Sequence, residues 1–176
     1  MAERIRELLS EEEVARRVQE LADQINGDYG GRELTVVGIL KGAVFFTCEL
    51  AKRLTMPVTM DFMAVSSYGS GTESSGSVKI IKDLDLPIEG RDVLIVEDII
   101  DSGYTLSYLK SFLEKREPRS VRLCTLLNKP ERRVKKEVTV DYEGFCIPDQ
   151  FVVGCGLDYD QKYRNLPYIG IVEFEK

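Results

Sequence analysis

Residues 93–105 read VLIVEDIIDSGYT and indicate both the fold and the chemistry of this chain. The first four residues, 93–96, form a continuous apolar run, which is typical of a strand buried on both faces. Two adjacent acids, Glu97 and Asp98, end this run. A third acid, Asp101, follows just before a Ser-Gly turn, where a helical pattern begins.

This order of residue types suits one kind of ligand. Carboxylates can hold a sugar diol or a Mg²⁺ ion, and the free N–H groups at a helix start can hold a phosphate. A plain strand with a solvated acidic loop is the alternative, but three neighbouring acids repel one another unless a cation or donors lie nearby. The segment therefore predicts a sugar-phosphate site.

The same segment resembles the 5-phosphoribosyl-1-pyrophosphate (PRPP) motif of type I phosphoribosyltransferases, and VEDIIDSG resembles the hypoxanthine-guanine branch. The resemblance implies that Glu97 and Asp98 hold the ribose diol and Mg²⁺, and that Asp101 is the general base. It assigns the 5′-phosphate to a loop of four residues, Ser102, Gly103, Tyr104 and Thr105. Tyr104 is a mild departure, since some relatives carry Lys there, but its backbone N–H can still serve the phosphate.

A second match to this family is PDQFVVGCGLDYDQKYR, residues 148–164. By the resemblance, Phe151 stacks on the purine ring and the backbone of Val152 recognises the edge of the base. Asp158 would lie near the base and a second Mg²⁺, and Arg164 would bind pyrophosphate. An aromatic ring with an arginine suits a flat base and a polyanion.

Two shorter matches concern residues that would be unremarkable alone, a strand-to-helix turn and a solvated lysine. The LKG at residues 40–42 resembles the family's pyrophosphate loop, which often contains a non-proline cis peptide, so Lys41 and Gly42 would bind pyrophosphate. Lys129, within LLNKP, matches the lysine that donates to the 6-oxo group of the purine. A cationic donor at this place favours 6-oxopurines over adenine.

Residues 66–77 read SSYGSGTESSGS, and nine of these twelve are Ser or Gly. Such a composition predicts a mobile segment. We prefer a long loop between two antiparallel strands to a domain linker, because neither flank looks like a complete domain. Long loops of this kind are often lids, and Ser67 and Tyr68 resemble the Ser-Tyr of the family's catalytic lid.

Strand and helix patterns alternate along the middle of the chain. Strands are predicted at 34–39, 58–65, 78–84, 93–96, 121–127, 138–140, 151–154 and 168–172. Helices are predicted at 11–27, from the break at 40–42 to about residue 54, and at 105–116. A capping box of Ser10 and Glu13 marks the first helix. The alternation predicts an α/β fold with a doubly wound parallel sheet that binds ligands at the carboxyl ends of its strands. We expect a single domain over residues 1–176, to which the resemblance adds a small hood subdomain and the lid.

Composition narrows the function further. The formal net charge of −6 argues against nucleic acid as a partner. The chain has no His, so carboxylate, Lys or Tyr must transfer any proton. No targeting segment or membrane span is evident, which predicts a cytoplasmic protein. Four cysteines without metal-binding spacing are expected to be reduced core thiols: Cys48, Cys124, Cys146 and Cys155.

The resemblance implies purine salvage, in which hypoxanthine or guanine reacts with PRPP to give IMP or GMP and pyrophosphate. It also implies Mg²⁺ as cofactor and a homodimer or homotetramer. One alternative is a non-catalytic or RNA-binding regulator built on the same fold, and another is a transferase for xanthine or a pyrimidine. Lys129 and the FVVG segment favour 6-oxopurines, among which hypoxanthine, guanine and xanthine remain open.

Overall fold

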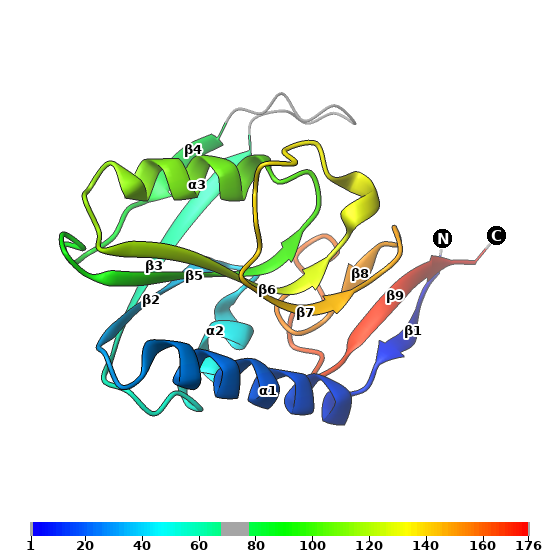
Figure 1. The fold of residues 1–176 in the computed structure, drawn as a ribbon. Coiled ribbons are helices and arrows are strands. Elements are labelled where there is room, and N and C mark those ends of the chain that lie inside the picture. The colour runs from blue at the N-terminus through cyan, green and yellow to red at the C-terminus, as the bar shows by residue number, and fades with distance from the viewer. Residues whose placement is uncertain (1, 68–77, 176) are drawn as a thin grey trace.

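The computed structural model describes residues 2–67 and 78–175, which form two β-sheets and three α-helices (Figure 1). Tyr68 and the rest of the predicted lid up to residue 77 lie outside the described residues. The lid therefore stays a prediction.

The larger sheet has six strands in the order β4-β3-β2-β5-β6-β7. Their bounds are β2 Leu34–Leu40, β3 Val58–Ser67, β4 Val78–Lys82, β5 Asp92–Ile100, β6 Ser120–Asn128 and β7 Tyr142–Cys146. Neighbouring strands are parallel except that β4 is antiparallel to β3. The predicted doubly wound sheet and the antiparallel pair flanking the Ser/Gly segment are both confirmed.

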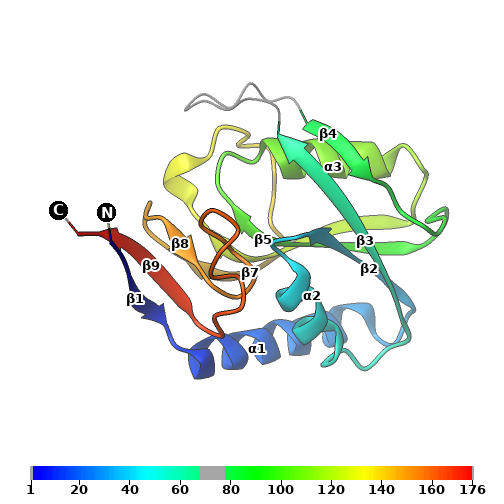
Figure 2. The same ribbon diagram turned by 180° about the vertical axis from the view of Figure 1, so that it is seen from behind.

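Helices cover both faces of this sheet (Figures 1 and 2). Helices α1 (Glu11–Tyr29) and α2 (Val44–Ala51) lie on one face, and α3 (Tyr104–Glu114) lies on the other. The start of α1 is as predicted, since the Glu13 N–H donates to Ser10 Oγ at 3.1 Å. The helix ends at Gly30, whose φ of 56° is a left-handed conformation that glycine adopts without strain.

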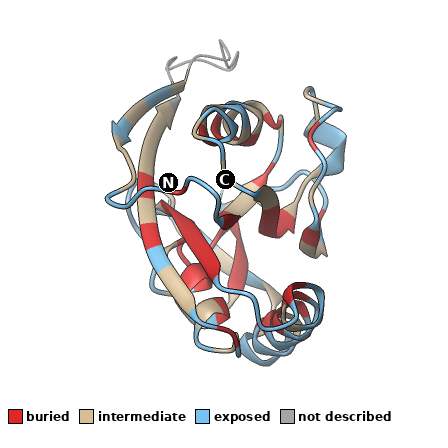
Figure 3. Cartoon of the chain, turned by 60° about the vertical axis from the view of Figure 1, so that its left-hand side comes forward, coloured by how far each residue is buried: buried red, intermediate tan, exposed pale blue. Residues whose placement is uncertain are grey.

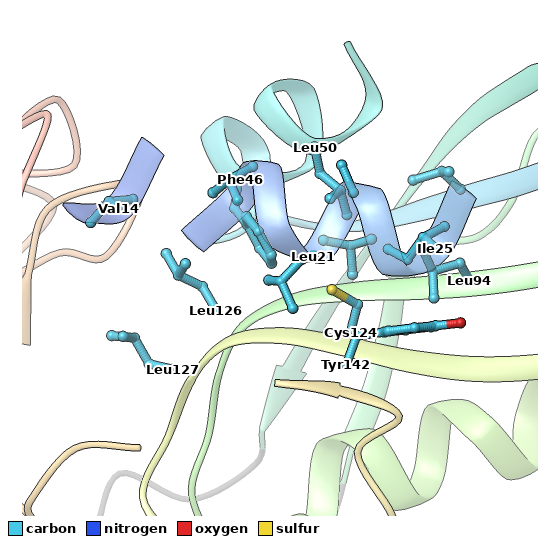
Figure 4. Close-up of a cluster of buried hydrophobic side chains, with 14 of the residues drawn as sticks. Val14, Leu21, Ile25, Phe46, Leu50, Leu94, Cys124, Leu126, Leu127 and Tyr142 are labelled. Atoms are coloured by element: carbon cyan, nitrogen blue, oxygen red, sulfur yellow. The ribbon is translucent and has the colours of Figure 1, made fainter. Parts of the chain in front are cut away.

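The strand predicted at 93–96 lies at the centre of the fold. All four of its side chains are fully buried, and they alternate between two apolar clusters. Leu94 and Val96 pack beneath α1 and α2 in the cluster drawn in Figure 4, whereas Val93 and Ile95 pack beneath α3. Figure 3 shows the same concentration of buried residues in the central strands.

A smaller sheet of three strands lies beyond β7, in the order β1-β9-β8. The strands are β1 Glu3–Leu9, β8 Val152–Val153 and β9 Ile169–Phe174. This sheet brings the two ends of the described chain side by side (Figure 2). The sequence reasoning missed β1, because its charged residues look solvated and its partner β9 is more than 150 residues away.

The strand predicted at 138–140 is wrong, because these residues form no strand and β7 follows at Tyr142–Cys146 instead. Val138 is 8% exposed and packs into the cluster beneath α3, so it is buried without belonging to a β-strand. Tyr142 pairs with Cys124 of β6, and its hydroxyl donates to Asp28 Oδ2 at 2.6 Å. These contacts place the strand at Tyr142–Cys146, after the β-branched residues 138–140 on which the prediction was based.

All four cysteines are free, but only Cys124 is fully buried. Cys48 and Cys155 are half-buried, and Cys146 is exposed, so the prediction of four core thiols is wrong for Cys146. Among residues 2–67 and 78–175, no helix combines the length and the apolar character needed to cross a membrane.

Candidate active site

Strand β5 carries two adjacent carboxylates near its carboxyl end, of which Glu97 is buried and Asp98 is half-buried. Glu97 is 8% exposed, and its Oε1 accepts the Asp98 N–H at 3.0 Å. The Ile99 N–H donates to Asp98 Oδ1 at 2.6 Å. Burial raises the pKa of Glu97 well above its ordinary value, and the neighbouring Asp98 charge raises it further. Burial also raises the pKa of Asp98, although hydrogen bonds and the charge of Arg164 act in the opposite direction.

A cavity of about 260 Å³ lies at this end of the strand. Its lining comprises Glu97, Asp98, Ile99, Ile100, Asp101, Gly103, Thr105 and Leu106. Five of these, including all three acids, are predicted site residues. The cavity therefore places the three acids beside the start of α3. Gly103 precedes the helix with φ of 88° and provides no side-chain cap. As at any helix start, the first-turn N–H groups lack intrahelical acceptors, and Ser102 Oγ accepts only that of Tyr104, at 3.5 Å. This geometry suits an anion at the helix start and a cation or diol at the carboxylates.

The turn between β5 and α3 is held by a segment that the sequence reasoning did not single out. The Ser102 carbonyl accepts the N–H groups of Val134 and Lys135, each at 2.9 Å. Arg133 Nε donates to the Asp101 carbonyl at 3.0 Å. Asp101 itself is exposed, and its Oδ1 accepts the Ser102 N–H at 2.6 Å. The backbone around Asp101 is therefore fixed while one carboxylate oxygen stays available.

The predicted pyrophosphate loop packs directly against the acids. The Leu40–Lys41 peptide is cis, as the resemblance led us to expect. A Cβ on Gly42 would lie 1.8 Å from Asp98 Oδ2, and a Cβ on Gly156 would lie 2.0 Å from the Gly42 carbonyl oxygen. The absence of a side chain permits both approaches, so the segment of Gly42 packs on Asp98 and the segment of Gly156 packs on Gly42. Gly156 was missed because its partner is remote in sequence.

Arg164 and Lys41 line a second cavity, of about 530 Å³, beside this loop. Arg164 donates to the Gly156 carbonyl at 2.7 Å and to Gln161 Oε1 at 3.2 Å. The same Gln161 oxygen accepts from Lys41 Nζ at 3.4 Å. Gln161, which the sequence reasoning also missed, thus connects the two predicted pyrophosphate-binding cations. Asp158 pairs with Arg164 at 3.3 Å.

The residues predicted to bind the base lie on β6, β8 and their loops. Lys129 has a side chain only 12% exposed, and its Nζ lies 3.7 Å from Asp149 Oδ1. Phe151 is 52% exposed. It meets Tyr159 edge to face, with 5.6 Å between ring centroids. Val152 is buried in β8, where its backbone pairs with Ile171.

The structure does not gather every predicted residue. Ser67 is the last residue of β3, opposite Val78, and Tyr68 lies outside the described residues. Within residues 2–67 and 78–175 no three His, Cys, Asp or Glu side chains cluster closely enough to hold a metal ion, and the prediction of Asp158 near a second Mg²⁺ stays a prediction.

A family model for the phosphoribosyl transferase domain matches residues 5–160 of this chain. The chain belongs to this family. The hypoxanthine-guanine phosphoribosyltransferase of Mycobacterium tuberculosis (strain ATCC 25618 / H37Rv) is 53% identical over 172 residues, covering 94% of this chain and 85% of that protein. The bifunctional protein TilS/HprT of Listeria monocytogenes serotype 4b (strain F2365) is 55% identical over 168 residues; the match covers 96% of this chain but only 26% of that protein.

Among solved structures, a hypoxanthine-guanine phosphoribosyltransferase from Bacillus anthracis str. 'Ames Ancestor', with a HEPES molecule in its active site, matches with a TM-score of 0.92. It is 48% identical, and the match covers 97% of this chain and all of that one. The type I phosphoribosyltransferase fold that the two motifs implied is thus confirmed, with β1, β8 and β9 in the place of the expected hood.

Glu97→Gln should stabilise the ligand-free protein at neutral pH by ~1–2 kcal/mol. Because the folded-state pKa of Glu97 is raised, this carboxyl favours folding below its ordinary pKa of 4.5, and that contribution is lost as the pH rises through the raised value. Gln keeps an oxygen for the Asp98 N–H but carries no charge. Denaturant unfolding of both proteins from acid to neutral pH measures the effect. Equal stability at neutral pH would contradict it, and exposed Glu89→Gln is the matched control.

Gly42→Ala should destabilise the protein by ~1–3 kcal/mol, because the new methyl group would overlap the Asp98 carboxylate. Gly27→Ala is the control, since nothing lies within 4 Å of its Cβ position in α1. That change should stabilise by ~0.5–1 kcal/mol through helix propensity. Denaturant midpoints of the two variants should therefore move in opposite directions, and a neutral Gly42→Ala would refute the close approach.

Proposed function

We propose that this chain transfers the 5-phosphoribosyl group of PRPP to hypoxanthine or guanine, giving IMP or GMP and pyrophosphate. The observation that carries the proposal is the cavity in which Glu97, Asp98 and Asp101 meet the uncapped start of α3. A ribose phosphate presents a diol and a phosphate, and this cavity offers partners for both. The names of the 53%-identical and 48%-identical relatives support the same activity.

On the sugar side, Glu97 and Asp98 orient the ribose hydroxyls, and the loop of Ser102, Gly103, Tyr104 and Thr105 surrounds the 5′-phosphate at the start of α3. Lys41, Gly42 and Arg164 bind the pyrophosphate. Two of these contribute positive charge, and Gly42 contributes backbone that no side chain obstructs. Electrostatic stabilisation of the departing pyrophosphate is the largest contribution expected of such groups.

On the base side, Phe151 stacks on the purine, the backbone of Val152 contacts its edge, and Lys129 donates to its 6-oxo group. Asp101 accepts the proton that the purine loses from N7 as a ring nitrogen bonds to the anomeric carbon and the bond to pyrophosphate breaks. With no His in the chain, an exposed carboxylate within the site is the base at hand. Asp149 Oδ1, 3.7 Å from Lys129 Nζ, helps to position the ammonium group.

Mg²⁺ fits the donor set of this site. Glu97 and Asp98 supply hard oxygen ligands, and Mg²⁺ takes one or two carboxylates together with substrate oxygens and water rather than a full protein cage. This agrees with the lack of a three-residue cluster among the described residues. When bound, Mg²⁺ neutralises charge on the pyrophosphate. Asp158 stays a predicted ligand of a second ion, and the dimer or tetramer also stays a prediction.

The test is formation of nucleotide from PRPP against a panel of hypoxanthine, guanine, xanthine, adenine and uracil, with Mg²⁺ and in excess EDTA. We expect turnover with hypoxanthine or guanine that depends on the metal. Turnover with xanthine or uracil alone would point to another base. No turnover, together with tight and specific RNA binding, would point to a regulator.

Asp101→Asn should slow nucleotide formation by ~10²–10⁴-fold, the usual loss for a general base. Asparagine keeps the oxygen that accepts the Ser102 N–H, so the turn and PRPP affinity should be preserved. The measurement is single-turnover kinetics alongside PRPP titration, with Asp23→Asn on α1 as the control. Turnover within a few-fold of wild type would remove Asp101 from the mechanism.

Lys129→Ala should raise the KM for the 6-oxopurine at least tenfold and leave the KM for PRPP nearly unchanged. The reason is that Lys129 lies on the base side of the site, while Asp149 keeps Arg132 as a partner at 3.5 Å. Separate KM determinations provide the measurement, and exposed Lys136→Ala is the control. A rise confined to the PRPP constant would move Lys129 to the phosphate side.

A further inference from the structure

A second polar cavity, of about 350 Å³, lies at the opposite end of the large sheet, where β2 and β5 begin. It is lined by Arg32, Glu33, Thr35, Gly90, Arg91, Asp92 and Arg119. Leu34 and Asp92 are paired in the ladder, and Asp98 lies six positions after Asp92 along β5. At ~3.3 Å per residue, the cavity is about 20 Å from the candidate active site.

Three guanidinium groups surround the cavity against two carboxylates, which leaves one net positive charge in a chain of net charge −6. Arg32 Nε lies 3.2 Å from Asp92 Oδ2, and Arg119 Nε lies 3.9 Å from Oδ1 of the same carboxylate. Arg91 lies 3.2 Å from Glu33. The arginine side chains are 43%, 60% and 45% exposed, respectively, so a solute can reach all three.

Asp92 keeps these arginines at the cavity. Its side chain is 5% exposed, and Ser120 Oγ donates to it at 2.6 Å. Burial acts to raise the pKa of Asp92, but the hydrogen bonds from Ser120 and Arg32 outweigh it and hold the pKa below its ordinary value. The carboxylate is therefore charged at neutral pH and anchors Arg32 and Arg119 beside the opening.

Thr35 gives a separate indication of a ligand. It is 2% exposed and lines the cavity, yet its hydroxyl has no hydrogen-bond partner among residues 2–67 and 78–175. A buried hydroxyl without a partner costs free energy, and such groups are rare in folded proteins. The oxygen has almost no accessible surface, so an acceptor in the cavity reaches it only when the cavity wall around Thr35 adjusts.

We propose that this cavity binds a phosphate-bearing small molecule, whose phosphate oxygens accept from Arg91, Arg119 and the Thr35 hydroxyl. Guanidinium groups pair with phosphate through two parallel hydrogen bonds, and arginine is weakly hydrated compared with lysine. A volume of about 350 Å³ leaves room for more than the phosphate group. The proposal is independent of the transfer reaction, because none of these residues belongs to the candidate active site.

The test is an amide NMR titration with inorganic phosphate, with sodium chloride at matched ionic strength as the reference for screening. Wild-type amides at 32–35 and 90–92 should shift and saturate with phosphate but not with chloride. Amides at 97–106 report phosphate in the active site independently. Shifts confined to 97–106, or equal shifts with chloride, would overturn the proposal.

Two variants sharpen the test. The double substitution Arg91→Gln and Arg119→Gln should weaken binding at 32–35 and 90–92 at least tenfold and leave the shifts at 97–106 unchanged. Arg4→Gln with Arg16→Gln removes the same charge elsewhere and should alter neither. Unchanged affinity at the cavity in the first double variant would contradict the proposed contacts.

Thr35→Val separates ligand binding from structural support. The hydroxyl has no partner in the described protein, so its removal should leave the melting temperature equal or higher. Phosphate affinity at the cavity should nevertheless fall three- to tenfold. A lowered melting temperature with unchanged affinity would show that the hydroxyl serves the fold and would overturn its assigned role.

Discussion

The close burial of Glu97 and Asp98 at the end of β5 is the constraint on which the rest of the site depends. These two adjacent carboxylates lie just past the point where the pairing of β5 with β2 ends, while its pairing with β6 continues, and Gly42 lies against one of them. Glycine is required there because any side chain would occupy the place of the Asp98 carboxylate. Gly156 packs in turn on the Gly42 carbonyl, which brings the loop carrying Arg164 to the same point.

This arrangement costs stability, because burial disfavours the charged form of both acids and each charge opposes the other. Backbone N–H groups and Arg164 offset part of the cost. The destabilisation that is not offset is typical of ligand-binding sites, where strain or charge repulsion persists because the surrounding fold keeps the groups in place. Here the apolar clusters on both faces of β5 keep the strand, and with it the two acids, in place.

The central part of this organisation was predictable from local sequence. The apolar run at 93–96 fixed a strand buried on both faces, and the acids and Ser-Gly turn after it placed a polar cavity at its end. Residues that act through long-range contacts were not predictable. Gln161 joins Lys41 to Arg164, and Arg133 holds the turn at Asp101, but nothing in their local sequence marks either role.

The same distinction explains the errors in the fold. The charged strand β1 forms only because β9 lies beside it, and β7 is positioned by contacts of Tyr142 with α1 and β6 rather than by β-branched residues. The exposure of Cys146 follows from its place at the end of β7, on the outer strand of the large sheet. Local pattern therefore predicted central elements better than edge elements.

The central claim is that the buried acids of β5 are stabilised by the substrate and its metal. The most direct measurement is the melting temperature from pH 4.5 to 8, with and without PRPP and Mg²⁺ together. In the ligand-free protein the stability relative to Glu97→Gln should fall as the pH rises, because the raised pKa of Glu97 makes its ionisation unfavourable to folding. The stabilisation by PRPP and Mg²⁺ should grow over the same range. A ligand effect that is independent of pH, or absent, would contradict the account.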